Sequence, residues 1–325
     1  MTKTVITTMK NEGAFLLEWV AHHKSLGFDH IVICTNDCAD PTREMALRLG
    51  EMGLARHHAT KKWASTSTQR AALKQASRYP EVAKADWLYV CDADEFLVSK
   101  IGNGSLQALI DAASTGVDVI AIPWRIFGPN GQSDYREGRI TAQFLSARAV
   151  PDPGQLAPAY PKSVFRGLQN MHRIGIHGPV PRPDLGRDLH RELPGGQPMI
   201  PQHHPIFVQA DYRFAQINHY TLRSRDSFLV KRDRGRVNHM LQSMDIDYWD
   251  RFDVAQVPCS AIRHYDQSTQ NWLDQLLSDP ALATLHAQAV AWHRAKITAL
   301  HQSPDYAALI AATDERLRQC ASSQS

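Results

Sequence analysis

Long apolar runs are missing from this chain of 325 residues, and no apolar leader follows its first residue. A membrane-spanning helix needs about 20 consecutive apolar residues, which the sequence nowhere supplies. Residues 1–6 lead directly into a short strand pattern instead of the apolar core of a signal peptide. The five cysteines show no Cys-x-x-Cys spacing, which is typical of reduced thiols in a cell interior. We therefore expect a cytoplasmic protein without a transmembrane segment.

Concentrated charge is also missing. The net charge is +3 and is spread thinly, whereas a nucleic-acid-binding face needs clustered basic residues. A glycine-rich phosphate loop is absent after the first expected strand, where the chain reads Met9-Lys10-Asn11-Glu12-Gly13. We therefore expect no nucleic-acid partner, and the missing loop argues against a nucleotidyltransferase.

An acidic stretch is the most informative feature that is present. Asp92, Asp94 and Glu95 follow an apolar run at residues 87–91, which is typical of a buried strand. Ligands of open α/β sheets bind at the carboxyl ends of strands. Side chains two residues apart on an extended segment point the same way, and two facing carboxylates favour a hard divalent cation between them. A solvated acidic turn is the alternative interpretation.

The segments around this stretch alternate between strand and helix patterns. Strands are expected at residues 3–9, 30–35, 54–58, 86–91 and 117–123, and helices at 12–26, 43–52, 66–79 and 105–113. The second helix would have Asp40 as its N-cap. This alternation predicts a parallel sheet in a Rossmann-like half at about residues 1–125.

The rest of the chain divides into a loop-rich part and a helical part. Residues 126–223 are the loop-rich part, in which Pro, Gly and His are dense from residue 151 to 205 and a short strand is expected at 162–166. Together with residues 1–125 they form the expected main domain, 1–223. Helices are expected at 224–240, 268–277, 280–302 and 304–320, in a C-terminal extension over 224–325. These helices either cover the main domain or mediate self-association.

Several motifs, taken in order, resemble one family. They are Met9-Lys10-Asn11-Glu12, Asn36-Asp37-x-x-Asp40, residues 87–96 (WLYVCDADEF), Trp124-Arg125-x-Phe127-Gly128, and Asn218-His219-Tyr220 followed by Lys231 and Arg234. This series resembles glycosyltransferases of the GT-A fold, in particular the bacterial branch of glycosyltransferase family 2 that is related to family 92 (galactan synthase-like). The resemblance implies a GT-A (Rossmann-like) mixed sheet with flanking helices and a helical C-terminal extension.

The resemblance also implies a reaction and a metal. A metal-dependent enzyme would transfer a sugar, with inversion, from a nucleoside diphosphate sugar, here a UDP-sugar, to a carbohydrate or glycolipid acceptor. Asp94 and His219 would bind Mn²⁺ or Mg²⁺, and Asp92 would hold the ribose or the metal's water shell. Alternatively, His219 is a hydrogen-bonded structural residue packed by Tyr220. Glu95 could equally take part in the site or only brace the loop.

The remaining site residues are carried by the same resemblance. Asn11, Glu12 and Asp37 would face the nucleoside. Asp40 would either contact the nucleoside with them or only cap the second expected helix. Lys231 and Arg234 come from a basic run that also contains Arg232 and Arg236. They would either contact the diphosphate or belong to a solvated helix face, and Trp124 would either stack on a sugar or pack in the core.

The catalytic base is the least determined of these roles. His177 is the first candidate for the base, although it could instead belong to the metal's shell. The sequence leaves three alternatives open, which are His172, Asp184 and His204. A non-catalytic protein that binds nucleotide sugars or carbohydrates is the rival function.

Overall fold

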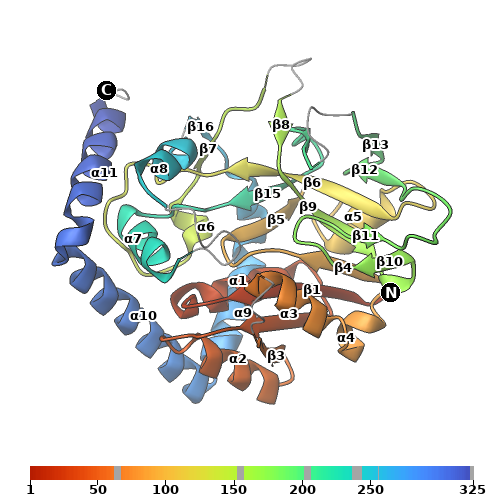
Figure 1. The fold of residues 1–325 in the computed structure, drawn as a ribbon, viewed down its shortest axis with the longest axis horizontal. Helices are drawn as coiled ribbons and strands as arrows, with labels where there is room; N and C mark the ends of the chain where they lie inside the picture. Colours follow the sequence, from red (N-terminus) through yellow and green to blue (C-terminus); the bar gives the residue numbers. More distant parts are fainter. Residues whose placement is uncertain (62–66, 152–156, 201–205, 236–243, 255, 323–325) are drawn as a thin grey trace.

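A mixed sheet forms the centre of the molecule (Figure 1). The structure, a computed structural model, describes residues 1–61, 67–151, 157–200, 206–235, 244–254 and 256–322. The strands of the central sheet are β1 Lys3–Met9, β2 His30–Thr35, β3 Arg56–Ala59, β4 Trp87–Val90, β5 Glu95–Ser99, β6 Val119–Ile126, β9 Pro161–Arg166, β12 Arg191–Leu193, β13 Gln197–Pro198 and β15 Ala215–His219. Their order is β13-β12-β6-β9-β4-β1-β2-β3, and β15 pairs with β5 and β6.

Parallel pairing dominates the N-terminal half of the sheet. Strands β4, β1, β2 and β3 run parallel, with Ile6 opposite Val32 on one side and Val90 on the other. Strand β9 is antiparallel to both β4 and β6, while β15 is parallel to β6 and antiparallel to β5. The expected mixed α/β sheet is confirmed, and the ends of β1, β4, β6 and β15 meet at one region.

Alternating side chains of the strands supply a core on each face of the sheet. Val5 of β1 packs in one core with α1 Gly13–Ser25, α2 Thr42–Glu51 and α5 Leu106–Asp111. Ile6, the next residue, packs on the other face with α3 Thr68–Ala76 and α4 Pro80–Ala83. Successive side chains of a strand point to opposite faces, so the continuous apolar runs reflect a sheet covered on both sides.

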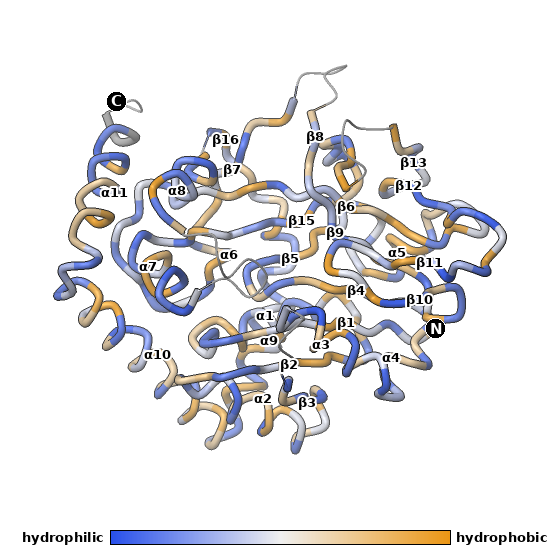
Figure 2. Tube along the Cα trace, in the orientation of Figure 1, coloured by the Kyte–Doolittle hydropathy of each residue, from blue (hydrophilic) through white to orange (hydrophobic). Residues whose placement is uncertain are grey.

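The C-terminal helices join the main core and do not stand apart from it. The helices are α7 Arg225–Arg234, α8 Ile246–Phe252, α9 Asp266–Leu277, α10 Pro280–His301 and α11 Pro304–Ser322. Leu276 of α9 and Leu282 of α10 are buried in the core that also contains α1. A third cluster, which includes Phe228 and Trp249, joins α7 and α8 to α10 and α11. Hydrophobic and hydrophilic residues alternate along α10 and α11 (Figure 2). Within the described residues no helix is long and apolar enough to cross a membrane.

Short elements complete the fold. They are α6 Ile140–Gln143, the 3-10 turns Leu168–Asn170 and Ala261–Tyr265, and the strands β7 Ser146–Ala147, β8 Pro158–Ala159, β10 Met171–Arg173, β11 Val180–Pro181, β14 Val208–Gln209 and β16 Val257–Pro258. The small strands form two-stranded ladders, of which β7 with β16 lies next to the functional site.

Most expected elements are present with ends shifted by a few residues, and three differences matter for the site. Helix α2 begins at Thr42, so its N-cap is Pro41 and not Asp40. The sequence did not predict strands β5 and β15 or helix α8. Both strands are short and closely follow turns. Helix α7 ends at Arg234, where Gly235 has a φ of 78°, and the later part of the expected helix, with Arg236, lies outside the described residues.

Candidate functional site

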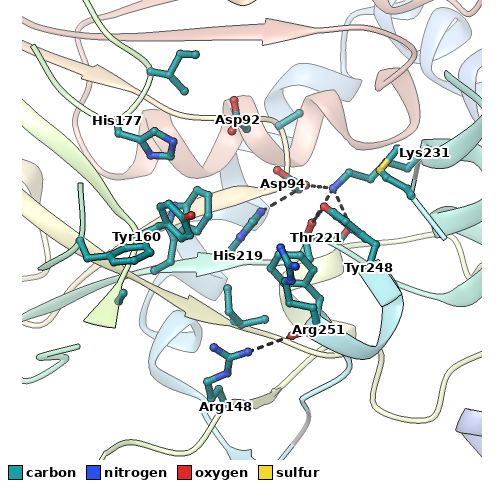
Figure 3. Close-up of a pocket in the computed structure, with 18 of the residues that line it drawn as sticks. Asp92, Asp94, Arg148, Tyr160, His177, His219, Thr221, Lys231, Tyr248 and Arg251 are labelled. Atoms are coloured by element: carbon teal, nitrogen blue, oxygen red, sulfur yellow. Dashed lines mark hydrogen bonds and ion pairs between the residues drawn. The ribbon is translucent and has the colours of Figure 1, made fainter. Parts of the chain in front are cut away.

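A cavity of about 470 Å³ opens where β1, β4, β6 and β15 end (Figure 3). Eight of the residues that the sequence singled out line it: Glu12, Asp92, Asp94, Trp124, His177, His219, Lys231 and Arg234. They come from segments as far apart as the turn after β1 and helix α7. The fold thus gathers most of the predicted site around one cavity.

Asp94 lies at the centre of the polar contacts in this cavity. Lys231 Nζ donates to Asp94 Oδ2 at 2.6 Å, and to the carbonyl and hydroxyl oxygens of Thr221 at 2.8 Å each. All three N–H bonds of this ammonium are therefore used. Burial alone would raise the pKa of Asp94, but the opposing charge of Lys231 holds it well below the usual range. Asp94 is thus a carboxylate at neutral pH.

His219 faces the same carboxylate from β15. Its Nε2 lies 3.8 Å from Asp94 Oδ2, and its buried Nδ1 has no hydrogen-bond partner within the described part of the chain. The Trp124 ring packs on the imidazole with 4.3 Å between ring centroids. Burial lowers the pKa of His219 to about 4, so the imidazole is neutral near pH 7 and carries a lone pair.

The resemblance implies a divalent metal, and the two residues expected to bind it directly, Asp94 and His219, fit one. A neutral imidazole nitrogen and a carboxylate oxygen 3.8 Å apart are donors that one Mn²⁺ could share. Asp92 is not free in the same way, since both of its oxygens accept hydrogen bonds. Within the described residues no group of three or more His, Cys, Asp or Glu side chains has the arrangement of a metal site. Asp94 and His219 are thus the two side chains here whose donor atoms could hold a metal ion between them.

A buried lysine fixes Asp92. Lys162 Nζ, on β9, donates to Asp92 Oδ2 at 3.1 Å and to the Ile176 carbonyl at 3.2 Å, and its side chain is fully buried. Gln69 Nε2 donates to the other oxygen, Asp92 Oδ1, at 2.7 Å. Burial would raise the pKa of Asp92, but Lys162 lowers it below its usual value. Lys162 therefore keeps Asp92 ionised and holds it in one orientation.

Glu95 braces the turn behind these residues. It is fully buried and does not line the cavity, and its Oε2 accepts from the Asp92 backbone N–H at 2.9 Å. Lys162 Nζ lies 3.4 Å from Glu95, farther than from Asp92. One ammonium serves two carboxyl groups, and burial raises the pKa of Glu95 well above its ordinary value. These contacts favour the bracing role that the sequence left open.

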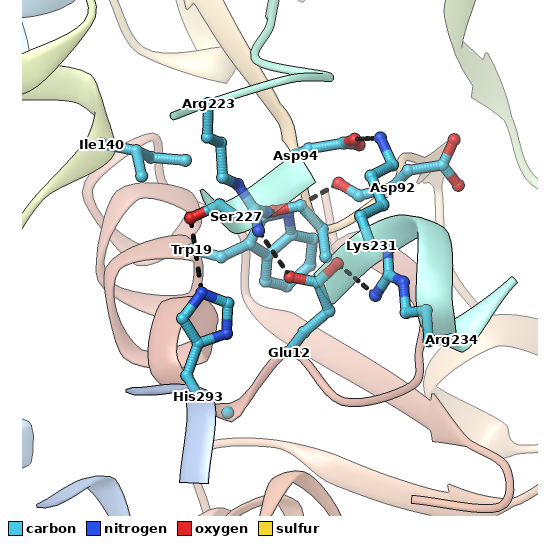
Figure 4. Close-up of polar contacts among 12 residues, drawn as sticks. Glu12, Trp19, Asp92, Asp94, Ile140, Arg223, Ser227, Lys231, Arg234 and His293 are labelled. Atoms are coloured by element: carbon cyan, nitrogen blue, oxygen red, sulfur yellow. Dashed lines mark hydrogen bonds and ion pairs between the residues drawn. The ribbon is translucent and has the colours of Figure 1, made fainter. Parts of the chain in front are cut away.

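Glu12 lies between two arginines (Figure 4). Arg223 donates to Glu12 Oε2 at 2.9 Å, and Arg234 contacts Glu12 Oε1 and donates to the Lys10 carbonyl at 2.6 Å. Burial would raise the pKa of Glu12, but the two guanidinium groups lower it. Two cations facing one carboxylate leave a surplus of positive charge at this side of the cavity, to which the nearby Lys10 adds.

His177 lies in an aromatic setting on the other side of the cavity. Its Nδ1–H donates to the Pro161 carbonyl at 3.0 Å, which assigns a proton to Nδ1, so that in the neutral ring the lone pair is on Nε2. The rings of Trp124 and Tyr160 lie 5.6 and 5.7 Å away, centroid to centroid. Of the other proposed bases, His172 and Asp184 are exposed and outside the cavity lining, and His204 lies outside the described residues.

Asn11 and Asp37 do not line the cavity, although Lys10 and Glu12 do. Both have positive φ values, 53° and 44°, and Asn11 Oδ1 accepts from the Ala39 N–H at 2.7 Å. Asp40 accepts from the Gly13 N–H at 2.9 Å and from the Thr42 hydroxyl at 2.6 Å. Asp40 is thus structural, while nucleoside contact by Asn11 and Asp37 stays a prediction.

Three contributors to the site were not named from the sequence as site residues: Gln69, Lys162 and Arg223. Lys162 carried a signal, since it is a charged residue near the start of a short segment that the sequence predicts as a strand. Arg223 carried none, because its role depends on a turn with a φ of 57° that places it on Glu12 and on the Phe15 ring, 3.7 Å from the ring centroid.

Comparison with known sequences points to one group of proteins. No protein-family model matches the chain. A glycosyltransferase family 92 protein of Oryza sativa subsp. japonica is 25% identical over 151 residues, which cover 46% of this chain and 25% of that protein. A family 92 protein of Ricinus communis is 22% identical over 152 residues, covering 46% and 27%. The chain thus matches about a quarter of the length of these relatives, and they support the family 92 resemblance.

Comparison with solved structures gives weaker similarities. TarS residues 1–349 of S. aureus align over 98% of this chain and 92% of theirs, with 12% identity and a TM-score of 0.36. The same fragment in complex with UDP aligns over 52% and 47%, with 16% identity and a TM-score of 0.33. Glucosyl-3-phosphoglycerate synthase from Mycobacterium tuberculosis, in complex with Mn²⁺, UDP and phosphoglyceric acid, aligns over 43% and 45%, with 16% identity and a TM-score of 0.28.

Proposed function

We propose that the protein is a metal-dependent glycosyltransferase that moves a sugar from a nucleoside diphosphate sugar, a UDP-sugar in the first instance, to a carbohydrate or glycolipid acceptor with inversion. The observation that carries this proposal is the position of Asp94 at the carboxyl end of the parallel strands β1 and β4, with Lys231 on one oxygen and neutral His219 beside it. Ligands of open α/β sheets bind at this end of the strands.

The charge around the cavity supports an anionic donor. Each cavity carboxylate already has a cationic partner, and Glu12 has two. A diphosphate would bring negative charge to the surplus near Arg234 and Lys10. Arg234 suits this role, since its Nε has no partner within the described residues. Lys231 would exchange its bond to the Thr221 hydroxyl for a phosphate oxygen.

Asp94 and His219 would hold the metal, Mn²⁺ or Mg²⁺, with diphosphate oxygens as further ligands. A bound cation would neutralise the charge that the leaving diphosphate gains. Asp92, held by Lys162 and Gln69, would accept from a ribose hydroxyl or from a water of the metal. Asn11, Glu12 and Asp37 would position the nucleoside. Glu12 would do so indirectly, by holding Arg223 and Arg234 in place.

His177 is the proposed base. Its Nε2 lone pair would take the proton of the acceptor hydroxyl, whose oxygen attacks the anomeric carbon while the bond to the diphosphate breaks on the opposite side. The electron pair leaves with the diphosphate. Trp124, packed against both His177 and His219, would stack on the apolar face of a sugar between them.

The division of the chain follows from these roles. Residues 1–125 would supply most of the nucleotide site, residues 126–223 would supply the acceptor side with His177, and the extension 224–325 would contribute Lys231 and Arg234. The extension closes the donor side of the cavity, because Arg234 contacts Glu12 in the first part of the chain.

Nucleoside diphosphate release tests the proposal. The protein is incubated with a panel of nucleotide sugars and Mn²⁺, with and without EDTA. The proposal predicts that at least one donor releases its nucleoside diphosphate and that EDTA suppresses the release. Binding of a nucleotide sugar with no release from any donor would instead support the non-catalytic binding protein.

A further inference from the structure

Two arginines lie in the part of the cavity that the proposed donor does not use. Arg148 and Arg251 both line it, on the far side of His219 from Asp92 (Figure 3). Arg148 follows β7, and Arg251 belongs to α8. One N–H of Arg148 donates to the Arg251 carbonyl at 3.1 Å. Segments about a hundred residues apart thus bring two guanidinium groups to one wall.

The fold holds this pair in place. Strand β7 pairs with β16, and the Arg148 backbone N–H donates to the Ile126 carbonyl at 2.8 Å. The next residue, Ala149, donates its N–H to Gln256 Oε1 at 3.0 Å. The backbone that carries Arg148 is therefore fixed against β6, whose Trp124 lines the same cavity.

Neither guanidinium group is neutralised within the described part of the chain. The carboxylates of the cavity are Glu12, Asp92 and Asp94, and each is paired with another cation. Among the described residues, no acidic side chain forms an ion pair with Arg148 or Arg251. Two such cations in one wall favour an anionic ligand, and a guanidinium group binds carboxylate or phosphate through two parallel hydrogen bonds.

Aromatic rings lie on the neighbouring wall. Tyr160 packs on Trp124 with 5.4 Å between centroids and on Phe207 with 4.5 Å. Tyr160 is 43% exposed, so part of its ring is open to a ligand. Aromatic rings bind the apolar face of a sugar, while the arginines would bind its charged group.

We infer that this end of the cavity is an acceptor subsite for a carbohydrate that carries a carboxylate or phosphate, with Arg148 and Arg251 binding the anionic group. The acceptor role of this subsite rests on the proposed function, whereas the binding of an anionic carbohydrate to the two arginines does not. An acceptor bound there would lie on the side of His219 away from Asp92, with its charge held at a distance from the diphosphate.

Equilibrium binding of three matched probes tests the subsite. The probes are p-nitrophenyl β-glucoside, its 6-phosphate and p-nitrophenyl β-glucuronide, titrated into the protein saturated with UDP and Mn²⁺. We expect the phosphate or the glucuronide, or both, to bind at least about tenfold more tightly than the neutral glucoside. The double variant Arg148→Gln/Arg251→Gln should lose that difference and still bind UDP, whereas Arg263→Gln, an exposed arginine outside the cavity lining, should retain it.

The two charged probes separate a carboxylate-bearing ligand from a phosphate-bearing one. Equal binding of all three probes, failure of all three to bind, or an unchanged preference in the double variant would overturn the inference. If UDP itself does not bind, the proposed function fails instead, and the probes are then titrated into the protein alone, where the same outcomes decide the subsite.

Discussion

At the scale of the residue, one buried cation of the site is shared by two carboxyl groups. Lys162 is fully buried and contacts both Asp92 and Glu95, at 3.1 and 3.4 Å. Removing one partner of a buried ion pair leaves an uncompensated charge, which costs far more than the loss of an exposed pair. Lys162 is thus both a structural residue and the group that positions Asp92.

Lys162→Met should therefore lower the free energy of unfolding by about 3–5 kcal/mol. Urea unfolding at pH 7.5 measures this, and Lys84→Met, at an exposed position, should change it by less than about 0.5 kcal/mol. Equal stability of the two variants would show that Lys162 does not compensate the buried carboxylates.

A buried histidine gives a prediction on pH. His293 packs between the rings of Phe15 and Tyr135, and burial lowers its pKa from 6.5 to about 4. Because the folded state binds this proton less tightly than the unfolded state, the stability is complete above pH 6.5 and is lost as the pH falls toward 4.

Relative to His293→Phe, which cannot ionise, the natural protein should lose roughly 2 kcal/mol of stability between pH 7.5 and pH 4.5. Urea unfolding at a series of pH values measures the difference. His172→Phe, at an exposed position, retains His293 and should lose the same stability over this pH range as the natural protein. Parallel pH profiles of the natural protein and His293→Phe would refute the neutral, buried state of His293.

At the scale of the element, the C-terminal helices stabilise the start of α1. Gly13, the first residue of α1, leaves no room for a side chain: a Cβ there would lie 2.7 Å from Ala289 Cβ of α10 and 2.9 Å from an Asp40 oxygen. Helix α10 thus packs on the turn that carries Glu12, and it belongs to the support of the cavity.

Gly13→Ala should destabilise the protein by about 1–3 kcal/mol, because α10 or Asp40 must move. Gly50→Ala is the matched control, since Gly50 also lies in a helix, α2. A Cβ at Gly50 would lie 3.4 Å from its nearest neighbour, the carbonyl oxygen of Ala55. That variant should be unchanged or up to about 1 kcal/mol more stable. Thermal or urea unfolding of the two variants measures this difference in stability. Equal stabilities of the two variants would contradict the close packing of α10 against Gly13.

At the scale of the whole molecule, the sequence predicted the alternating half of the sheet well. The apolar runs of β1, β2 and β4 are covered on both faces, so periodicity and turn residues located them within a residue or two. The acidic turn could be placed for the same reason, since it directly follows β4.

The rest could not be read from local pattern. Strand β15 is short, and it brings His219 to Asp94 only because it inserts between β5 and β6. Lys162 contacts Asp92, which is 70 residues away in sequence, and Arg223 contacts Glu12, which is 211 residues away, and no local spacing encodes either contact. Only the family resemblance assigned His219, Lys231 and Arg234 to the site. Local sequence patterns could not predict that these three side chains lie close together, because the fold alone brings them there.

The most direct test of the central claim is calorimetric titration of UDP, with GDP in parallel, in the presence and absence of Mn²⁺. We predict that one nucleotide binds, at least about tenfold more tightly with Mn²⁺, and that Asp94→Asn loses this metal-dependent gain. Asp111→Asn, at an exposed position on α5, should bind as the natural protein does. No binding of either nucleotide, or equal metal-dependent affinity in Asp94→Asn, would contradict a donor site built on Asp94.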